Sequence, residues 1–532
     1  MTEGSKQTVG EALISLLEAH RVQFVFGIPG VHTLELYRGL ASSTIRHITP
    51  RHEQGAGFMA DGYARVSGKP GVAFVITGPG LTNTITAMGQ ARADSIPMLV
   101  ISSVNKTETL GKGLGYLHEL PDQRGLIEKV ALFSHRIEDG NELPEILARA
   151  FTLFAMGRAG PVHIEIPMDV LGKPIGKLER LTLDTPSKKP NAEQIVVAQR
   201  LIGQSQKPVI LAGGGAKGAE AALQKFAGRL DAPVVLTANA RGLLYKHPLC
   251  VPASPSLKGV RKLIDEADLV IAVGTEFGPT DYDMYGDGGF SMPENLIRID
   301  IDKEQLKRRS ATLSIEAEAS IALDALKLAL PAGAGTRGES GAARAKAARE
   351  AALGDLDPVF QKQLPVLEAI RDTLPGAIII GDSTQPIYAG NLYYDHDRPA
   401  GWFNAATGFG ALGYGPPAAI GAALAMPDAP VVCLTGDGGL QFTLAELGAA
   451  RDAKAAVIFV VWNNRGYREI ETSMLDVGIE PVGVSPEPPD FTLIAKAYGI
   501  AAERVSEVSG LVEALKRARE GDVPYLIEFM VD

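Results

Sequence analysis

Residues 429–466 read APVVCLTGDGGLQFTLAELGAARDAKAAVIFVVWNNRG, two short apolar runs with a helical stretch between them. Each run has the length and the β-branched content of a buried strand. The first run ends in Gly436-Asp437-Gly438-Gly439 and the second in Asn463-Asn464-Arg465-Gly466. A strand, a helix and a second strand in this order are typical of a parallel βαβ unit. The stretch therefore predicts an α/β fold in which both polar ends lie at one edge of a sheet.

The same alternation of short β-branched runs and helical stretches continues through all 532 residues. Two polar connectors of low periodicity, residues 172–191 and 331–358, interrupt it. The second is rich in Ala, Gly and charge, and predicts either a linker or a weakly packed surface helix. We therefore expect three doubly wound α/β domains with mainly parallel sheets, over residues 1–175, 190–332 and 358–532.

Composition narrows the possible partners. The net charge of −10 argues against nucleic acid or an anionic membrane, which need a basic face. Cys250 and Cys433 are the only cysteines, so we expect no disulfide framework and a reducing, cytoplasmic location. The N-terminus lacks the pattern of a signal peptide, and no apolar run has membrane-spanning length. We expect a small-molecule substrate.

Asp437 and Asn464 follow neighbouring predicted strands, so their oxygens should meet at the same edge of the sheet. A carboxylate, an amide and a backbone carbonyl are ligands that suit Mg²⁺, and the glycine-rich helix start suits a diphosphate. Either motif alone is more often a simple turn or loop. Their pairing across one βαβ step is much more specific, and it predicts a magnesium site that holds a diphosphate.

GDGGLQ (436–441) followed by WNNRG (462–466) resembles the cofactor motif of the thiamine diphosphate enzymes, which include acetolactate synthases and pyruvate decarboxylases. The resemblance implies that Asp437, the Asn464 side chain and the Gly466 carbonyl hold Mg²⁺. It also places Gly436, Gly438 and Gly439 at the diphosphate. Gly439 departs from the family, which commonly has Ser there, so a backbone N–H would replace a hydroxyl contact.

RHEQGA (51–56) followed by MADGYAR (59–65) is nearly verbatim the family phrase whose Glu binds the pyrimidine ring of the cofactor. The resemblance assigns that role to Glu53, which shares a proton with the ring so that the cofactor supplies its own base. Without it, a single Glu would be read as a structural acid. The remaining expected cofactor contacts, carried over from TGPGLTN, GFGALGYG and GDSTQPIY, are Pro79, Asn83, Gly410, Leu412, Thr384 and Gln385.

The resemblance has two further consequences. Family sites form between the first domain of one subunit and the third domain of another, which implies a homodimer or homotetramer. Gly213-Gly214-Gly215-Ala216-Lys217-Gly218 fits the dinucleotide fingerprint, so a dinucleotide-dependent oxidoreductase is a remote alternative. The acid expected downstream is met only loosely by Asp231, and a tight turn explains the glycines better. Residues 274–283 lack the arginines of the flavin-binding family members, so we expect no FAD.

The shared reaction is loss of CO₂ from a 2-oxo acid, followed by protonation to an aldehyde or by ligation to a second carbonyl. Ile470 stands where pyruvate decarboxylases have a catalytic Glu, so other proton donors are needed. His32 and His118 lie in loops that line the family's substrate pocket, and either could instead be a structural histidine. GIPGVHTLELYRGL with LHELPDQR looks most like the 5-guanidino-2-oxopentanoate (2-ketoarginine) decarboxylases. An acetolactate synthase acting on pyruvate is the main alternative.

A guanidinium tail on the substrate would need carboxylates in the pocket to pair with it. The sequence offers four acids in the relevant loops: Glu119, Asp122, Glu469 and Glu471. Surface acids are common, so each could also be solvated.

Overall fold

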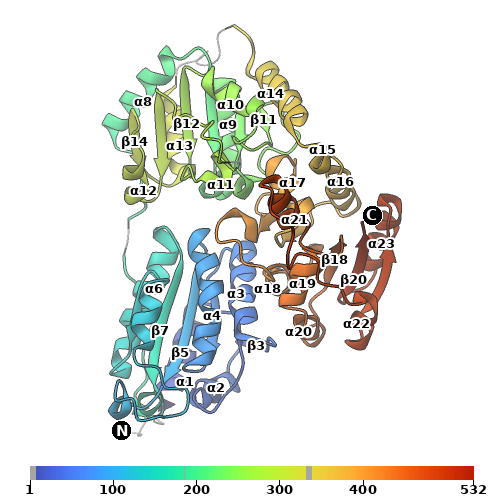
Figure 1. The fold of residues 1–532 in the computed structure, drawn as a ribbon. Coiled ribbons are helices and arrows are strands. Elements are labelled where there is room, and N and C mark those ends of the chain that lie inside the picture. Colours follow the sequence, from blue (N-terminus) through green and yellow to red (C-terminus); the bar gives the residue numbers. More distant parts are fainter. Residues whose placement is uncertain (1–6, 185, 285, 331–337, 532) are drawn as a thin grey trace. The chain divides into compact units, whose positions relative to one another are not determined.

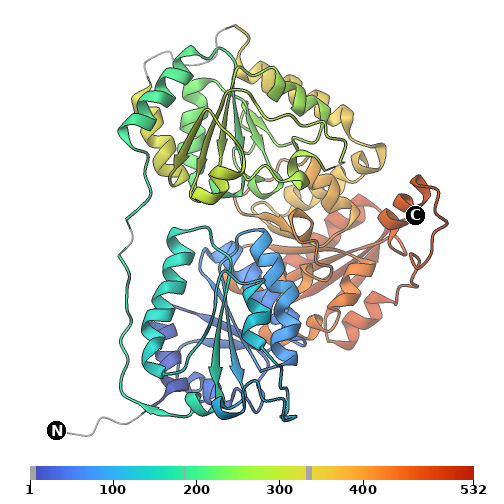
Figure 2. The same cartoon turned by 60° about the vertical axis from the view of Figure 1, so that its left-hand side comes forward.

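The computed structural model describes residues 7–184, 186–284, 286–330 and 338–531 (Figure 1). Three six-stranded, mainly parallel sheets carry the chain, and helices alternate with their strands. The helices lie on both faces of the sheets (Figure 2). This confirms the predicted α/β class, and it explains the continuous apolar runs, because strands covered on both faces have no polar side.

The first sheet has the strand order β3-β2-β4-β5-β7-β6. Its strands are β2 (Phe24–Gly27), β3 (Arg46–Ile48), β4 (Gly71–Val75), β5 (Met98–Val104), β6 (Ser134–Arg136) and β7 (Pro161–Pro167). Its helices are α1 (Val9–Ala19), α2 (Leu34–Leu40), α3 (Glu53–Ser67), α4 (Pro79–Ala93), α5 (Gln123–Glu128), α6 (Leu143–Met156) and α7 (Met168–Leu171). A small antiparallel pair, β1 (Gln7–Thr8) with β8 (Pro174–Ile175), closes the segment. Val25, Phe74, Leu99 and Ile164 are fully buried in its core.

The second sheet has the order β11-β10-β9-β12-β13-β14. Its strands are β9 (Pro208–Ala212), β10 (Val234–Leu236), β11 (Cys250–Val251), β12 (Leu269–Val273), β13 (Leu296–Asp300) and β14 (Leu313–Glu316). The main helices around it are α8 (Ala192–Gln204), α9 (Glu220–Leu230), α10 (Lys258–Asp265), α11 (Pro279–Tyr282), α12 (Lys303–Arg308), α13 (Ala319–Ala329) and α14 (Gly341–Asp355).

The third sheet has the order β16-β15-β17-β18-β20-β19. Its strands are β15 (Ile378–Gly381), β16 (Trp402–Asn404), β17 (Val431–Gly436), β18 (Val457–Asn463), β19 (Ala501–Val505) and β20 (Tyr525–Met530). The helices of this part are α15 (Pro358–Gln361), α16 (Leu364–Thr373), α17 (Gln385–Leu392), α18 (Gly415–Ala425), α19 (Asp437–Phe442), α20 (Glu446–Ala453), α21 (Arg468–Asp476), α22 (Phe491–Ala497) and α23 (Val508–Arg519).

The chain forms two compact units, the first from residues 1–185, 408–507 and 517–532 and the second from 186–407 and 508–516. Each predicted domain contains one of the three sheets, and the predicted domain boundaries stay a prediction. The described part of the connector 176–190 has neither helix nor strand, in line with its lack of periodicity.

The region 331–358 differs from its prediction in one respect. Residues 331–337 lie outside the described residues, and α14 follows them. Weak packing was predicted for a helix here, but Ala345, Ala348 and Ala352 are buried in a core beside the second sheet. A Cβ at Gly259 of α10 would lie 2.6 Å from Ala351 Cβ, so the two helices approach closely. Small residues allow this contact, and their low hydrophobicity hid it in the sequence.

Helix α3 is packed directly against α18 within the first unit. A Cβ at Gly62 would lie 2.0 Å from the carbonyl oxygen of Ala418, and one at Gly421 would lie 2.0 Å from that of Met59. The glycines therefore let two backbones cross in contact. Tyr414 Oη donates a hydrogen bond to Asp61, which is also paired with Arg65 at 2.6 Å. These contacts tie the helix that begins at Glu53 to the C-terminal part of the unit.

Cys250 and Cys433 are both buried, and neither forms a disulfide within the described residues. Within the described ranges, no helix combines the length and the apolar character needed to cross a bilayer.

Candidate active site

Asp437 lies where the sequence predicted it, at the carboxyl end of β17 and the start of α19. Gly436 pairs in register with Trp462, so the ends of β17 and β18 are neighbours at one sheet edge. The carboxylate is 2% exposed, and the N–H of Gly466 donates to its Oδ2 at 3.0 Å. Burial raises the pKa of Asp437, against the lowering effect of backbone N–H groups of Gly438 and Gly466.

The two asparagines after β18 have different roles. The Asn463 amide donates to Glu528 Oε1 at 2.7 Å, and its oxygen accepts from the Arg465 N–H at 3.2 Å. Both the nitrogen and the oxygen of the Asn463 side chain are therefore hydrogen-bonded within the protein. Asn464 follows it at the same edge, and its backbone carbonyl accepts from Arg468 Nε at 2.9 Å.

Gly466 is required as a glycine. Its φ is +149°, and a Cβ there would lie 2.5 Å from the Val484 carbonyl oxygen. At Gly438 the room left by the missing side chain is filled, because a Cβ would lie 2.4 Å from Cε1 of Tyr467. The Tyr467 ring therefore lies against the side of Gly438 where a side chain would stand, and the expected diphosphate contact at Gly438 stays a prediction.

The donor set at this edge fits Mg²⁺. Mg²⁺ prefers a few carboxylate oxygens completed by neutral oxygens, and Asp437, the Asn464 amide and the Gly466 main chain meet that description. A bound cation would favour the charged form of Asp437 and so oppose the effect of burial on its pKa. The described residues contain no gathering of three or more His, Cys, Asp or Glu side chains that could hold a metal. The predicted set has a single carboxylate and would not form such a gathering.

Glu53 is the first residue of α3, and Asn83 lies in the second turn of α4. The Asn83 amide donates to Glu53 Oε2 at 3.0 Å. Both side chains are partly exposed, so the carboxylate keeps an open side. A Cβ at Gly80 would lie 3.6 Å from Glu53 Oε1. The structure thus brings together Glu53, Asn83 and the Pro79-Gly80 turn, as the sequence predicted.

The loop that carries His118 is packed against this turn. Gly78 has a φ of +65°, and a Cβ there would lie 2.5 Å from the His118 carbonyl oxygen. The Gly30 turn approaches the same region, since a Cβ at Gly30 would lie 2.6 Å from Cγ2 of Ile76. Three loops, after β2, after β4 and after β5, therefore meet at one end of the first sheet.

His32 and His118 face each other there. Their ring centroids are 5.0 Å apart with the ring planes at 33°. His32 is 6% exposed, and burial together with the nearby His118 lowers its pKa. In each ring Nδ1 is buried and has no hydrogen-bond partner among the described residues. Buried polar atoms normally find partners, so these two nitrogens are available to a ligand.

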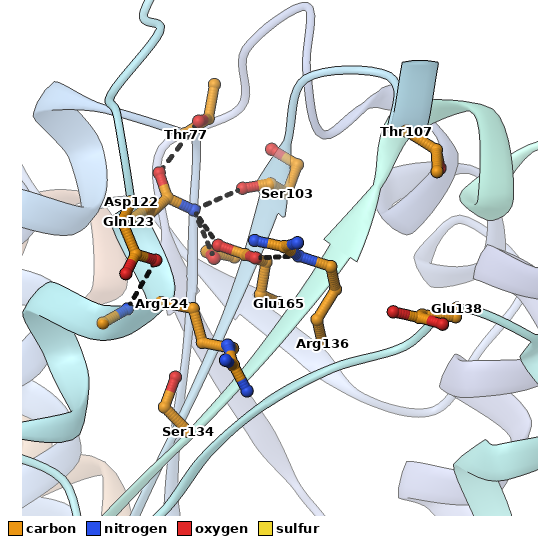
Figure 3. Close-up of polar contacts among 12 residues, drawn as sticks. Thr77, Ser103, Thr107, Asp122, Gln123, Arg124, Ser134, Arg136, Glu138 and Glu165 are labelled. Atoms are coloured by element: carbon orange, nitrogen blue, oxygen red, sulfur yellow. Dashed lines mark hydrogen bonds and ion pairs between the residues drawn. The ribbon is translucent and has the colours of Figure 1, made fainter. Parts of the chain in front are cut away.

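Gln123 lies between Thr77, Ser103 and Glu165, next to the turn that leads into α4 (Figure 3). Its Oε1 accepts from Thr77 Oγ1 and from the Gly78 N–H, both at 2.8 Å. Its amide nitrogen donates to Glu165 Oε2 at 2.9 Å and to the Ser103 carbonyl at 3.1 Å. The residue is 2% exposed, so it ties the turn at Gly78 to the ends of β5 and β7 without reaching solvent.

The four acids expected to pair with a cationic substrate tail differ in the partners that they already have. Glu119 accepts three backbone N–H groups of its own loop, from Gly113, Gly115 and Tyr116. Asp122 caps α5 by accepting from the Gly125 N–H at 2.9 Å. Both acids therefore hold local structure. Glu471 pairs with Arg468, and Glu469 has polar contacts of its own.

An open cavity of about 620 Å³ lies at the surface beside the segment that follows Gly466. Glu471, Glu480, Pro481, Gly483, Val484, Ser485 and Pro486 line it. The Tyr467 N–H donates to the Val484 carbonyl at 2.7 Å, which fixes this wall next to the predicted metal loop. Glu480 was not among the expected acids, because no pattern marks its loop.

The remaining expected cofactor residues lie in three places. Gly410 has a φ of +75°, and Leu412 is partly exposed in a loop held by the bond from Thr443 Oγ1 to the Gly413 carbonyl at 2.8 Å. Gly439 is buried in α19. Thr384 and Gln385 begin α17 in the second unit, where Thr384 is 6% exposed.

The glycine run after β9 is a packing turn. Cβ atoms at Gly213 and Gly215 would lie 2.3 Å and 2.8 Å from atoms of Gly274, which follows β12. Asp231 ends α9 in a left-handed conformation, and its carboxylate accepts from the Gly341 N–H at 2.8 Å. A dinucleotide fingerprint needs its acid at the end of a strand, so the oxidoreductase alternative loses its support.

Comparison with known proteins adds the following. Three family models of thiamine pyrophosphate enzymes match the chain, the N-terminal TPP binding domain over residues 7–126, the central domain over 195–326 and the C-terminal TPP binding domain over 382–529. The chain is 43% identical to the probable 2-ketoarginine decarboxylase AruI of Pseudomonas aeruginosa, covering 96% of this chain and 91% of that protein. It is 33% identical to the probable acetolactate synthase large subunit of Methanocaldococcus jannaschii (98% and 91% covered). It is 30% identical to the acetolactate synthase isozyme 1 large subunit of Escherichia coli (99% and 94% covered).

Proposed function

We propose that this chain, which belongs to the thiamine pyrophosphate enzyme family, decarboxylates a 2-oxo acid without oxidation, and that its substrate is 5-guanidino-2-oxopentanoate. The products would be CO₂ and 4-guanidinobutanal. The similarity to a probable 2-ketoarginine decarboxylase over almost the whole chain supports this choice. An acetolactate synthase activity on pyruvate is the second candidate, because several relatives carry that name.

The residues that would hold the cofactor fall into two groups. Asp437, Asn464 and Gly466 would bind Mg²⁺ and through it the diphosphate, with Gly436, Gly438 and Gly439 at the helix start. Glu53, Pro79 and Asn83 would bind the pyrimidine ring, with further contacts from Thr384, Gln385, Gly410 and Leu412. When bound, thiamine diphosphate accepts the electron pair that loss of CO₂ leaves behind. The hydrogen bond from Asn83 fixes the orientation of Glu53, so that one carboxylate oxygen remains for the ring.

The pairing of His32 with His118 is the observation that favours decarboxylation. Formation of an aldehyde requires a proton at the reacting carbon, and two neighbouring imidazoles with free Nδ1 atoms can supply one. Burial and mutual repulsion keep His32 in its neutral form, so it can accept or relay a proton near neutral pH.

Glu480 in the lining of the cavity supports a cationic substrate tail, whereas Glu471 in the same lining is already paired with Arg468. A guanidinium group pairs well with a carboxylate. Replacing Glu480 by Gln should raise KM for 5-guanidino-2-oxopentanoate and leave KM for the uncharged 2-oxoisovalerate unchanged. Glu487→Gln, in the same loop but outside the cavity lining, is the matched control. Equal effects on both substrates would remove Glu480 from this role.

We further propose a homodimer, or a dimer of dimers, in which Glu53 and Asp437 of one site come from different subunits. This follows from the family resemblance. Sedimentation of the active protein tests it, because a fully active monomer would contradict it. The cofactor requirement is tested by removing thiamine diphosphate and Mg²⁺ and adding each back. We expect activity only with both.

A further inference from the structure

Glu446, the first residue of α20, is an acid with no place in the site described so far. It is 1% exposed, although a free carboxylate is among the groups least suited to burial. Its Oε1 accepts from the Arg51 N–H at 3.0 Å and from the His52 N–H at 3.1 Å. Its Oε2 accepts from the Arg51 N–H at 3.1 Å. The carboxylate therefore accepts from the backbone N–H groups of the two residues that precede Glu53.

Gly55 makes room for this contact. A Cβ at residue 55 would lie 2.3 Å from Glu446 Oε1 and 2.8 Å from Cδ. Any larger residue would push the carboxylate away from the start of α3. Glycine inside a helix lowers its stability. Gly55 in the first turn of α3 therefore indicates that the close contact with the Glu446 carboxylate requires a residue without a side chain.

A second link joins the same two elements. The Arg51 guanidinium forms an ion pair with Asp452, which also belongs to α20. The Arg51 side chain passes over Gly448, where a Cβ would lie 3.3 Å from its Nε. Helix α20 thus holds residue 51 by both its main chain and its side chain. Three hydrogen bonds and one ion pair thus link residues 51 and 52 to α20.

The hydrogen bonds between the Glu446 carboxylate and the two backbone N–H groups depend on how these groups are oriented. Backbone N–H groups at a helix start carry partial positive charge, and a buried carboxylate is stable only where such donors face it. His52 caps α3, with its Nδ1 accepting from the Gln54 N–H at 3.2 Å. The backbone N–H of His52 points away from α3 and donates its hydrogen bond to Glu446 Oε1. These bonds therefore fix the N–H groups of the two residues that precede Glu53.

We propose that Glu446 is a positioning residue for Glu53: its carboxylate fixes the Arg51 and His52 peptides and so sets where the Glu53 side chain starts. This rests on the proposed role of Glu53 as the acid at the cofactor ring. Helix α20 follows α19 closely along the chain, so the segment that begins at Asp437 continues into the helix that holds Arg51 and His52.

The test uses three variants of the full chain. Glu446→Gln keeps the shape but puts an amide NH₂ against the Arg51 N–H. Gly55→Ala displaces the carboxylate without removing it. Glu520→Gln, an exposed acid at the end of α23, is the control. The first readout is hydrogen exchange of the Arg51 and His52 amides in the chain without cofactor. We expect exchange to be at least about tenfold faster in both test variants and unchanged in the control, since about 1.4 kcal/mol corresponds to a factor of ten.

The second readout separates positioning from general stability. In the loaded enzyme we expect kcat to fall by about 100-fold, the scale for a misplaced catalytic group, with substrate KM little changed and the melting temperature within a few degrees. Unchanged exchange at residues 51 and 52, or faster exchange with wild-type kcat, would overturn the proposal. If the wild-type chain bound no thiamine diphosphate, both the proposed function and this role of Glu446 would be contradicted. If the wild type bound the cofactor and the variants behaved like it, only the role of Glu446 would be contradicted.

Discussion

The imidazole rings of His32 and His118 lie 5.0 Å apart, although they come from two different loops of the first sheet. His32 follows β2, and His118 follows β5 in a left-handed backbone conformation with a φ of +63°. The contact brings two titratable groups next to the turn at Gly78 and Pro79. This is the end of the sheet at which we propose that the pyrimidine ring of the cofactor binds.

His118→Gln should raise the pKa of His32, because it removes one of the two causes that lower it. Burial, the larger cause, remains, so the pKa should stay below that of a free histidine. Titration of the His32 ring by NMR measures this. His247→Gln in the second unit serves as a control that should leave the His32 signal unchanged. If the His32 pKa did not move in His118→Gln, the two rings would not interact as the geometry implies.

Asp437→Asn should abolish tight binding of the magnesium and diphosphate pair. Loss of an outer-shell partner of a metal commonly costs about 10–100-fold in affinity, so loss of a carboxylate ligand should cost at least about 100-fold. Trp462 lies next to the site in β18, and its fluorescence can follow titration with thiamine diphosphate and Mg²⁺. The control variant Asp476→Asn, at the exposed end of α21, should bind thiamine diphosphate and Mg²⁺ with the affinity of the wild type. Wild-type affinity in Asp437→Asn would remove Asp437 from the metal site.

Gly62→Ala and Gly228→Ala should have opposite effects on stability. At residue 62 the new Cβ would lie 2.0 Å from the Ala418 carbonyl oxygen, so the α3 and α18 backbones must separate. We expect a loss of about 1–3 kcal/mol in the free energy of unfolding. At residue 228, in α9, nothing lies within 4 Å of the new Cβ, and alanine should gain about 0.5–1 kcal/mol. Urea unfolding of both variants measures the difference, and equal effects would contradict the close crossing.

Glu446 should make stability depend on pH. Burial raises its pKa from 4.5 to about 7, so the folded chain binds its proton more tightly than the unfolded chain. The resulting stabilisation is complete below about pH 4.5 and is lost as the pH rises through 7. The chain without cofactor should therefore lose, relative to Glu446→Gln, on the order of 3 kcal/mol of unfolding free energy between pH 4.5 and 8. Parallel stability curves of the two proteins would exclude a buried, titrating Glu446.

The sequence predicted the parts of the site that follow from strand ends and short motifs. Asp437 and Asn464 were expected together because parallel strands end at a common edge, and Glu53 and Asn83 because the first-domain motifs matched a family. Gln123 and Glu446 could not be found this way. Their partners, such as Gly78 for Gln123 and Arg51 for Glu446, are distant in sequence, and only the folded chain brings them together. A buried-looking Glu in the apolar stretch LAELGAA was the one available signal for Glu446.

The positions of acidic residues in loops were the weakest guide to which carboxylates could pair with the substrate. Glu119 and Asp122 were expected as candidates for a cationic tail, yet they bind the N–H groups of their own loop and of α5. Such local bonds depend on backbone conformation that composition does not reveal. The packing of α14 was missed for a related reason, because alanines fill a close helix contact as well as they cover a surface.

The most direct test of the proposed function is product analysis with 5-guanidino-2-oxopentanoate and pyruvate supplied separately to the enzyme with thiamine diphosphate and Mg²⁺. We predict CO₂ and 4-guanidinobutanal in equal amounts from the first substrate, with kcat/KM at least about tenfold higher than for pyruvate, because a charged pair adds more than about 1.4 kcal/mol. Acetolactate as the main product from pyruvate, with no aldehyde from the guanidino acid, would contradict the decarboxylase and support a synthase.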